Sequence, residues 1–451
     1  MYYRYKHTFD ILLLKTYIEK DEYVWLREYL KNIHSADIAE AADSLTVAEI
    51  IIILKSVSYT KSANILSQLH VDFQKQVVDN MWSEDIAHAI EEMDTDDAAD
   101  ILSELDEEKK DEIFSHIHDK DHIDDIEELS AYDEDTAGSL MAKEYVQVQE
   151  NWIIEECLRE VRRQAQEVER VHSIYLVDSI GRLTGRVSLK DLISAPSWVT
   201  VSDIKRKRVD SVYDTDHARD VALLMEKYDM EAVPVINESG KLLGRITIDD
   251  VIDYVRETAE ENYNLASWLL HDSEASDGFL DMIRSRLPWL FIALIGWFFA
   301  VRVMGWFSEA IELYPELFFF TPLIAAMAWN AWVQSSAIIV QWLANGSITG
   351  TFLTRFPREI LLGFFNGVSL ALVLFWGSFL IFWFSLDILL TVSIALVCVI
   401  LLASMIGTFV PLMLHRFWVN PAVATGPFIT TSNDIFGILI YFSLAKIIIW
   451  F

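Results

Sequence analysis

The chain has 451 residues with 68 acidic and 36 basic side chains, which gives a formal net charge of -32 at pH 7, and 52% of its residues are hydrophobic. Residues 1–270 hold 58 acidic and 29 basic side chains, whereas residues 271–451 hold 10 and 7. This division excludes a simple soluble enzyme and a nucleic-acid-binding protein, because the latter needs a basic face. Cys157 and Cys398 are too few and too far apart to form a disulfide framework.

Residues 1–130 are predicted to form an acidic, superhelical α-helical domain. The segments 37–45, 85–93 and 97–105 share one pattern of acidic, small and apolar positions, which is typical of a stack of helical repeats. The apolar stretch at 11–14 is too short for a secretory signal. We therefore expect this domain to lie in the cytoplasm.

Residues 131–252 contain a tandem repeat whose two copies keep a constant offset, so that Gly181 corresponds to Gly240. The segment GRLTGRVSLKD at 181–191 recurs at 240–250 as GKLLGRITIDD. A short β-rich run precedes each copy, at 173–177 and 232–236, and a helix-like stretch follows, so each copy predicts strand, glycine turn, strand and helix. This α/β pattern resembles a tandem CBS domain pair, and the two Gly-x-x-Ser/Thr-x-x-Asp segments carry the resemblance.

Residues 253–282 are predicted to form a connecting, plug-like helix, and residues 283–451 an all-α transmembrane domain with five helices. Arginines such as Arg284 flank one side of the apolar stretches, and acidic residues such as Glu309 flank the other side. This distribution predicts a multidomain, multi-pass protein of the cell membrane with a cytoplasmic N-terminus and an outside C-terminus. Each apolar stretch covers the roughly 20 residues that a bilayer requires, and the five are 287–307, 317–344, 360–384, 388–414 and 428–450.

The second apolar stretch contains four amide side chains spaced 4, 7 and 4 residues apart, Asn330, Gln334, Gln341 and Asn345. At ~100° per residue they fall within about 60° of one another, so they form one polar stripe along a helix. Such a stripe either makes hydrogen bonds between helices or lines a polar path through the membrane. The amides alone leave both interpretations open.

The fifth apolar stretch contains a carboxylate, Asp434, on one helical face with Thr430, Gly437 and Tyr441. A carboxylate at the centre of a span costs roughly 2.5–3.5 kcal/mol on insertion scales. The sequence places no basic residue at a comparable depth, so Asp434 is either protonated or meets a mobile cation. The pattern favours the cation.

With these features the sequence resembles the MgtE-type magnesium transporter/channel family over nearly its whole length and in the family's domain order. The segments that carry the resemblance are AYDEDTAGSLM at 131–141, the second apolar stretch with its amides, and NPAVATGPFITTSNDIFGILIYF at 420–442. The resemblance implies a homodimer whose pore follows the two-fold axis, where Asp434 of each subunit faces a hydrated Mg2+. It also implies further contributions to this site from Ala424, Thr425, Thr430, Asn330 and Gln334.

One segment departs from the family pattern. Where the family usually has glycines around the first amide, this sequence has Trp329 and Trp332. Glycine permits close approach of backbones, whereas tryptophan fills space. This departure keeps two alternatives open: a membrane-anchored sensor of Mg2+ or nucleotide with a degenerate pore, and a transporter selective for another divalent metal such as Mn2+ or Co2+.

The acidic cytoplasmic part is expected to act as a Mg2+ sensor. The family resemblance implies that Mg2+ bridges carboxylates of the helical domain, the CBS pair and the connecting helix, and so favours a closed state. The ligands that it implies are Asp96, Asp100, Asp229, Asp250, Asp253 and Glu261.

The CBS resemblance implies a second ligand for the cytoplasmic part. An adenine nucleotide such as ATP would be bound by Ser188 and Asp191, and by Thr247 and Asp250, with a turn-stabilising aspartate as the alternative. His116, His118 and His122 have a spacing that suits a metal, but they lie among many acidic residues and are expected to be surface residues.

The sequence therefore predicts a regulated transporter or channel for divalent cations, without enzymatic activity. Mg2+ is the expected ion, and an adenine nucleotide is the further ligand. The predicted partners are a second copy of the chain, the lipid bilayer and divalent cations, but no nucleic acid.

Overall fold

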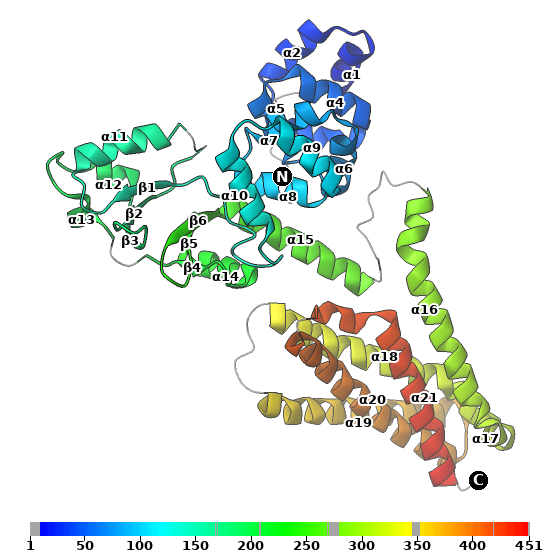
Figure 1. Ribbon diagram of the computed structural model, residues 1–451. Helices are drawn as coiled ribbons and strands as arrows, with labels where there is room; N and C mark the ends of the chain where they lie inside the picture. The colour runs from blue at the N-terminus through cyan, green and yellow to red at the C-terminus, as the bar shows by residue number, and fades with distance from the viewer. Residues whose placement is uncertain are drawn as a thin grey trace. The chain divides into compact units, whose positions relative to one another are not determined.

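The computed structural model describes residues 10–166, 168, 170–206, 209–267, 269, 279–344, 352–417 and 419–449. It divides into two compact units, Met1–Arg256 and Glu257–Phe451, and each is considered by itself. The first unit contains a helical domain and two small α/β domains, and the second contains the long apolar helices (Figure 1).

The predicted stack of short helices is confirmed. The helical domain contains ten α-helices and one 3-10 helix in its described residues, and these surround a single apolar core. They are α1 (Ile11–Glu19), α2 (Tyr23–Lys31), α3 (Ser35–Glu40), η1 (Ala41–Ser44), α4 (Val47–Ser56), α5 (Tyr59–Leu66), α6 (Val71–Asn80), α7 (Ser83–Ile90), α8 (Thr95–Ser103), α9 (Glu107–His116) and α10 (Lys120–Ser130).

The helices from α2 to α9 form two copies of one unit, related by a constant shift in the sequence that carries Lys61 onto Lys109. In the first copy, Nζ of Lys61 donates to the carbonyl of Leu30 at 2.7 Å. In the second copy, Nζ of Lys109 donates to the carbonyl of Val78 at 2.6 Å. Both lysines thus satisfy carbonyl groups near the end of a helix, where a positive charge is favoured.

Each of the two α/β domains contains a three-stranded sheet, as the tandem repeat predicts. The strand orders are β1-β2-β3 and β4-β5-β6, and in both sheets the first pair is parallel and the second antiparallel. The elements are β1 (Val146–Gln149), α11 (Ile154–Gln164), β2 (Ile174–Val177), β3 (Leu183–Val187), α12 (Leu189–Ser194), α13 (Val201–Ile204), β4 (Val212–Tyr213), α14 (Ala218–Tyr228), β5 (Ala232–Ile236), β6 (Leu242–Thr247) and α15 (Ile248–Ser267).

The glycine turns of the two copies join the two sheets. Gly181 and Gly240 have φ values of 82° and 81°, which other residues rarely adopt, so the turn requires glycine at both positions. The amide of Leu183 donates to the carbonyl of Gly240, and that of Leu242 to the carbonyl of Gly181, both at 3.0 Å. These reciprocal bonds give the pair an approximate two-fold arrangement.

The helical domain shares its apolar core with the second α/β domain, whereas the first α/β domain has a core of its own. The connecting segment makes this junction, because Ala137 and Met141 are buried and the amide of Ala142 donates to the carbonyl of Arg245 at 2.8 Å. The start of α8 therefore lies against the end of β6 and the start of α15 (Figure 1).

The second unit confirms the five expected apolar helices. α20 packs against α18, α19 and α21, and α16 packs along α21. Five helices have the length and composition to cross a membrane, Met282–Gly305, Pro315–Leu343, Pro357–Phe382, Leu386–Arg416 and Thr431–Ile449. The elements are α16 (Phe279–Gly305), α17 (Ser308–Leu313), α18 (Pro315–Ala344), α19 (Phe352–Phe382), α20 (Leu386–Arg416), η2 (Pro421–Thr425) and α21 (Pro427–Ile449).

Candidate functional site

Asp434 lies on α21 and is almost completely buried within its own chain, with 6% of its surface exposed. Among the described residues, Oδ1 of Asp434 and Nδ2 of the neighbouring Asn433 are buried without a hydrogen-bond partner. A buried carboxylate without a partner is unfavourable unless it is neutralised by a proton or a cation. The geometry therefore leaves Asp434 with unused capacity to interact with a cation.

The face of α21 that contains Asp434 packs against α18 and α20. A Cβ atom at Gly437, one turn after Asp434, would lie 3.5 Å from Ala328 and 3.5 Å from Val399. A further turn along, the hydroxyl of buried Tyr441 donates to the carbonyl of Leu317 at 2.7 Å. The side chains of Ala424, Thr425 and Thr430 lie outside the part of the chain that the structure describes.

The amide stripe of α18 lies on the surface of the single chain. Asn330, Gln334 and Gln341 are exposed, and Asn345 lies outside the described residues. The opposite face of α18 is buried and includes Trp332, which is 2% exposed. In a helix long enough to cross a bilayer, exposed amides are costly unless water or another polar surface covers them.

Trp332 packs in the core of the membrane helices, away from the amide stripe. A Cβ atom at Gly407 of α20 would lie 2.7 Å from the carbonyl oxygen of Trp332. A glycine on α20 therefore permits close approach where α18 has tryptophan. Trp329 is half-buried.

Sequence reasoning missed a second carboxylate in the membrane helices. Glu359 on α19 is half-buried, and its Oε1 accepts a hydrogen bond of 3.1 Å from the hydroxyl of buried Ser335 on α18. It lies beside Arg358, just before the apolar stretch expected at 360–384, and so fell outside that stretch. The signal that could have found it is its place inside an apolar helix, where a carboxylate is costly.

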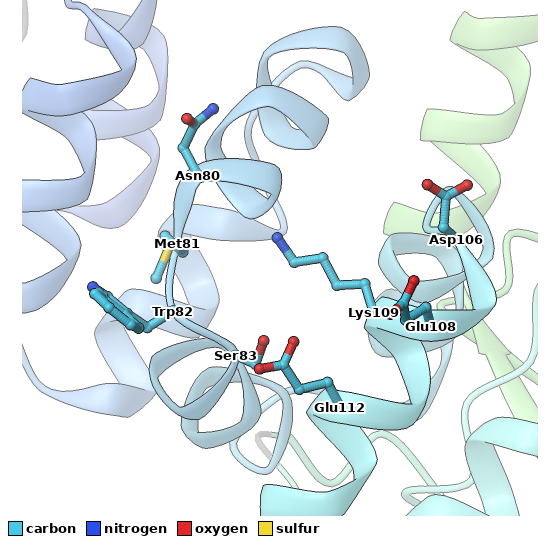
Figure 2. Close-up of a pocket in the computed structure, with 8 residues that line it drawn as sticks. All are labelled: Asn80, Met81, Trp82, Ser83, Asp106, Glu108, Lys109 and Glu112. Carbon is cyan, nitrogen blue, oxygen red and sulfur yellow. The ribbon is translucent and has the colours of Figure 1, made fainter.

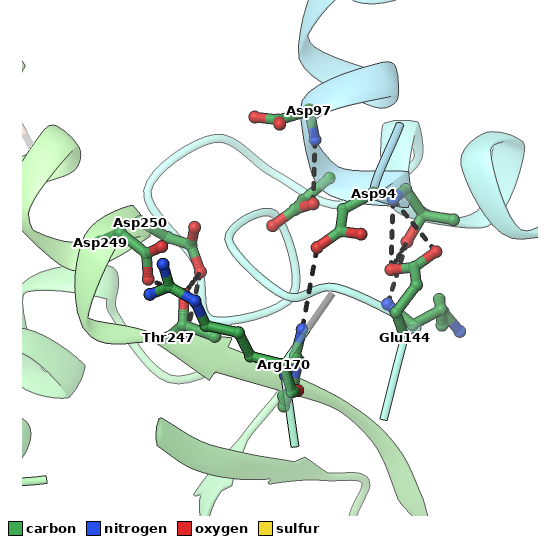
Figure 3. A network of polar contacts seen from close by, with 11 residues as sticks. Asp94, Asp97, Glu144, Arg170, Thr247, Asp249 and Asp250 are labelled. Carbon is green, nitrogen blue, oxygen red and sulfur yellow. Dashed lines mark hydrogen bonds and ion pairs between the residues drawn. The ribbon is translucent and has the colours of Figure 1, made fainter. Parts of the chain in front are cut away.

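In the first unit, a cluster of carboxylates lies between the start of α8 and the start of α15 (Figure 3). Burial raises the pKa of Asp96 well above its usual value, and the nearby charges of Asp250, Asp97, Asp94 and Glu144 raise it further. Burial, followed by the charge of Asp250, raises the pKa of Asp97 to about 6. The structure therefore brings two of the predicted ligands, Asp96 and Asp250, close together.

Part of this cluster has the geometry of a metal site. Asp94, Asp96 and Glu144 can each place one carboxylate oxygen within 4.8 Å of the others. The amide and hydroxyl of Thr95 donate to Glu144 at 3.2 and 3.0 Å, which fixes that carboxylate. Oxygen ligands of this kind suit hard cations such as Mg2+. We name Asp94, Asp96, Asp97, Glu144 and Asp250 the acid cluster.

The two helical copies differ at the position of the acid cluster. In the first copy Thr46 and Glu49 form a reciprocal cap at the start of α4. At the corresponding start of α8, Asp94 makes no capping hydrogen bond through its side chain, and Nη2 of Arg245 lies 3.7 Å from it. The second copy thus presents carboxylates where the first uses its side chains to cap a helix.

The other predicted regulatory residues lie outside the acid cluster. Asp100 is exposed on α8, Asp253 is exposed on α15, and Asp229 is the exposed C-cap of α14. Glu261 belongs to the second compact unit. Its carboxylate accepts a hydrogen bond of 3.3 Å from the side chain of Asn420.

The residues predicted to bind nucleotide form helix caps in the two α/β domains. The hydroxyl of Ser188 donates to Asp191 at 2.7 Å, and the hydroxyl of Thr247 donates to Asp250 at 2.6 Å. The same carboxylate of Asp250 belongs to the acid cluster. Asp250 therefore caps α15, and its charge also acts on the carboxylates at the start of α8 (Figure 3).

A groove of about 400 Å³ lies on the helical domain, between the start of α7 and α9 (Figure 2). It contains no residue of the acid cluster, and its Lys109 is bound to the carbonyl of Val78. It is lined by Asn80, Met81, Trp82, Ser83, Asp106, Glu108, Lys109 and Glu112.

Comparison with known proteins matches family models to most of the chain. A model described as a divalent cation transporter (MgtE) matches residues 321–444, and the MgtE intracellular N domain matches residues 33–135. CBS domain models match residues 137–197 and 201–257.

Two magnesium transporters are similar to this chain over the greater part of their length. The magnesium transporter MgtE of Thermus thermophilus is 31% identical over 445 residues, which cover 94% of this chain and 95% of the relative. The magnesium transporter MgtE of Enterococcus faecalis is 32% identical over 326 residues, which cover 71% of each chain.

Two solved structures are also similar to this chain. The soluble part of a magnesium transporter matches with 29% identity and a TM-score of 0.51, covering 55% of this chain and 97% of that chain. The cytosolic domain of the Mg2+ channel MgtE in complex with ATP matches with 34% identity and a TM-score of 0.51, covering 53% and 98%. The chain therefore belongs to the MgtE family of divalent-cation transporters, and it is a multi-pass membrane transporter rather than an enzyme.

Proposed function

We propose that this chain transports Mg2+ through a pore in which Asp434 faces the ion. The observation that carries the proposal is the buried carboxylate of Asp434, whose Oδ1 has no hydrogen-bond partner among the described residues. The relatives described above are named magnesium transporters, which favours Mg2+ over Mn2+ or Co2+ as the ion. Because Mg2+ gives up its water reluctantly, one carboxylate per subunit suits a hydrated ion.

The pore is formed by two copies of the chain around a two-fold axis. The exposed amides of Asn330 and Gln334 support this arrangement, because a second copy would remove them from lipid and place them along a polar path. Two Asp434 carboxylates near the axis repel each other, and a divalent cation relieves that repulsion. Oxygens of Ala424, Thr425 and Thr430 complete the ion site.

The burial of Trp332 favours a conducting pore over a degenerate one. Its side chain packs within the subunit, and Gly407 supplies the space on the neighbouring helix. The Trp332 side chain therefore does not obstruct the polar path that the amides of α18 line. The N-terminus lies in the cytoplasm and the C-terminus outside, in keeping with the arginines on one side of the spans.

The acid cluster closes this pore when Mg2+ binds to it. Repulsion among Asp96, Asp97 and Asp250 opposes their close packing while the site is empty, and a divalent cation removes that repulsion. Mg2+ thus binds the closed arrangement better than the open one and shifts the population toward it. Asp100, Asp229, Asp253 and Glu261 supply further ligands in the closed state.

The CBS pair binds an adenine nucleotide. A similar cytosolic domain is described as a complex with ATP, and it is 34% identical to this chain. Ser188 with Asp191, and Thr247 with Asp250, supply hydroxyl and carboxylate groups for the ribose. Because Asp250 also belongs to the acid cluster, nucleotide and Mg2+ would influence one another.

Growth of a magnesium-auxotrophic bacterium tests the transport function. The wild-type chain should restore growth at low Mg2+, and Asp434→Ala should fail although it is present in the membrane at the same level. Asp387→Ala, at the start of α20, serves as a carboxylate control and should restore growth. A well-expressed wild-type chain that does not restore growth would contradict the proposal.

A further inference from the structure

We propose that Arg245 is a fixed positive charge of the acid cluster that competes with Mg2+ for Asp94, and so sets the Mg2+ concentration at which the cluster is filled. Arg245 lies on β6, in the repeated segment of the second α/β domain. The inference rests on the proposed function of the acid cluster as a regulatory Mg2+ site. It adds the residue that determines the affinity of that site.

The positive charge of Arg245 is almost completely buried. The residue is 5% exposed, and a guanidinium keeps its proton at every pH at which proteins are folded. A buried charge is stable only beside opposite charges or hydrogen-bond acceptors. Because Asp94 at the start of α8 supplies such an opposite charge, Arg245 and the acid cluster form one electrostatic system.

The contacts of the guanidinium are incomplete. Nη1 donates to the carbonyl of Arg170 at 3.1 Å, whereas Nη2 lies 3.7 Å from Oδ2 of Asp94, beyond the usual range of an N–H···O hydrogen bond. Nε is buried without a hydrogen-bond partner among the described residues. The attraction between Arg245 and Asp94 is therefore mainly that of two charges, and a divalent cation can replace it.

Asp94 is the residue for which the two cations compete. Together with Asp96 and Glu144 it can place a carboxylate oxygen in a metal site, and it is also the ion-pair partner of Arg245. A second carboxylate is affected as well, because burial raises the pKa of Asp250 and the charge of Arg245 opposes that rise. Arg245 thus stabilises two carboxylates of the acid cluster when no metal is bound.

An ion bound to Asp94 would lie close to the guanidinium. With a Mg2+–oxygen distance of about 2.1 Å, the ion would lie no more than about 8 Å from Nη2, whichever oxygen of Asp94 binds it. At an effective dielectric constant of about 20, repulsion between these charges weakens Mg2+ binding by more than about tenfold. Arg245 therefore lowers the affinity of the acid cluster for Mg2+ and stabilises the first compact unit when Mg2+ is absent.

The first α/β domain contains a matched arginine away from the acid cluster. Arg186 occupies the position of Arg245 under the shift that carries Gly181 onto Gly240. It lies on β3, is half-buried, and forms no ion pair with a described residue. The repeat therefore explains why both positions have arginine, whereas the contact with Asp94 belongs to Arg245.

Two measurements on the purified full-length protein at neutral pH test the proposal. Arg245→Met removes the charge and keeps an unbranched side chain. Scanning calorimetry in EDTA should show a lower unfolding temperature for this variant, because Asp94 loses its opposite charge. Limited proteolysis should show that half-protection of the first compact unit requires at least about tenfold less Mg2+ than in wild type. A merely structural role of Arg245 would instead raise the Mg2+ requirement.

Two further variants separate charge from shape and position. Arg245→Lys keeps the positive charge and should keep the wild-type Mg2+ requirement within about threefold. Arg186→Met is the matched control and should protect like wild type. Arg245→Gln, which is neutral but polar, replaces Arg245→Met if the latter does not fold, and the same results are expected of it.

Asp96→Asn distinguishes a failure of this inference from a failure of the proposed function. If Asp96→Asn leaves the Mg2+ requirement unchanged, the acid cluster is not the regulatory site and both proposals fail. If Asp96→Asn raises the requirement but Arg245→Met does not lower it, the inference about Arg245 is overturned and the proposed function stands. The inference is also overturned if Arg245→Lys lowers the requirement as far as Arg245→Met does.

Discussion

Removal of one carboxylate from the acid cluster is expected to stabilise the first compact unit when metal is absent. Burial, followed by the charge of Asp250, raises the pKa of Asp97 from 3.8 to about 6. The folded protein therefore holds a proton at Asp97 more tightly than the unfolded chain does. The stability that this proton contributes is fully present below 3.8 and is lost as the pH rises through about 6. At neutral pH, Asp97 is consequently ionised at a cost to the fold.

The size of this cost follows from the pKa shift and the exposure of the side chain. A shift of about two units corresponds to about 3 kcal/mol. Neighbouring groups crowd the carboxylate of Asp97, but a large part of the residue's surface stays exposed to solvent, so screening reduces the expected effect to about 1 kcal/mol. In a unit of this size, Asp97→Asn should raise the midpoint of thermal unfolding by about 2–4 °C.

Scanning calorimetry of the purified full-length protein measures this effect. In EDTA at neutral pH, Asp97→Asn should unfold at a higher temperature than wild type, and the difference should shrink at mildly acidic pH and in excess Mg2+. Asp111→Asn, at an exposed position of α9, is the matched control and should leave the midpoint unchanged. The reasoning is refuted if Asp97→Asn has the wild-type midpoint in EDTA at neutral pH.

Three further predictions concern the two units. Thr95→Val removes the hydroxyl that donates to Glu144. Because a hydrogen bond to a charged group is lost, the Mg2+ concentration that protects the first compact unit from proteolysis should rise about tenfold, and unchanged protection would contradict this. Gly407→Val places side-chain atoms against the carbonyl of Trp332 and should destabilise the fold by about 1–3 kcal/mol. The yield of folded protein after extraction from the membrane should fall, and a wild-type yield would contradict this packing of α20 against α18. Asn330→Cys should give a disulfide between two chains in native membranes, whereas monomers alone after oxidation would argue against the two-fold pore.

Local patterns in the sequence are sufficient to predict much of the fold. The apolar lengths predict all five membrane helices, and the glycines at 181 and 240 predict the turns because their positive φ excludes most other residues. The run at 232–236 is predicted as a strand and forms β5 over those residues. Each of these signals depends on neighbours within a few positions of the chain.

Contacts between segments that are distant in the sequence cannot be predicted from such local patterns. Glu144 meets Thr95 and Asp96 only because the segment after α10 packs between the helical domain and β6. The sequence analysis accordingly named Asp96 and Asp250 from resemblance, but missed Glu144.

Asp434 differs from these residues because the sequence alone shows a carboxylate within an apolar helix. A carboxylate in an apolar helix is costly wherever the helix packs, so its presence indicates function before any contact is known. The sequence does not show which way the side chain of Asp434 points. The structure places Asp434 inside its own chain, on the face of α21 that approaches α18 and α20.

Uptake of Mg2+ into proteoliposomes, followed with an indicator enclosed in the vesicles, addresses the role of Asp434 most directly. The wild-type chain should admit Mg2+, while Asp434→Asn, which keeps the shape of the side chain and removes its charge, should lower the rate to that of empty vesicles. Asn433→Ala, at the neighbouring buried position, should retain measurable uptake. Uptake by Asp434→Asn at the wild-type rate would contradict the proposal that this carboxylate faces the ion.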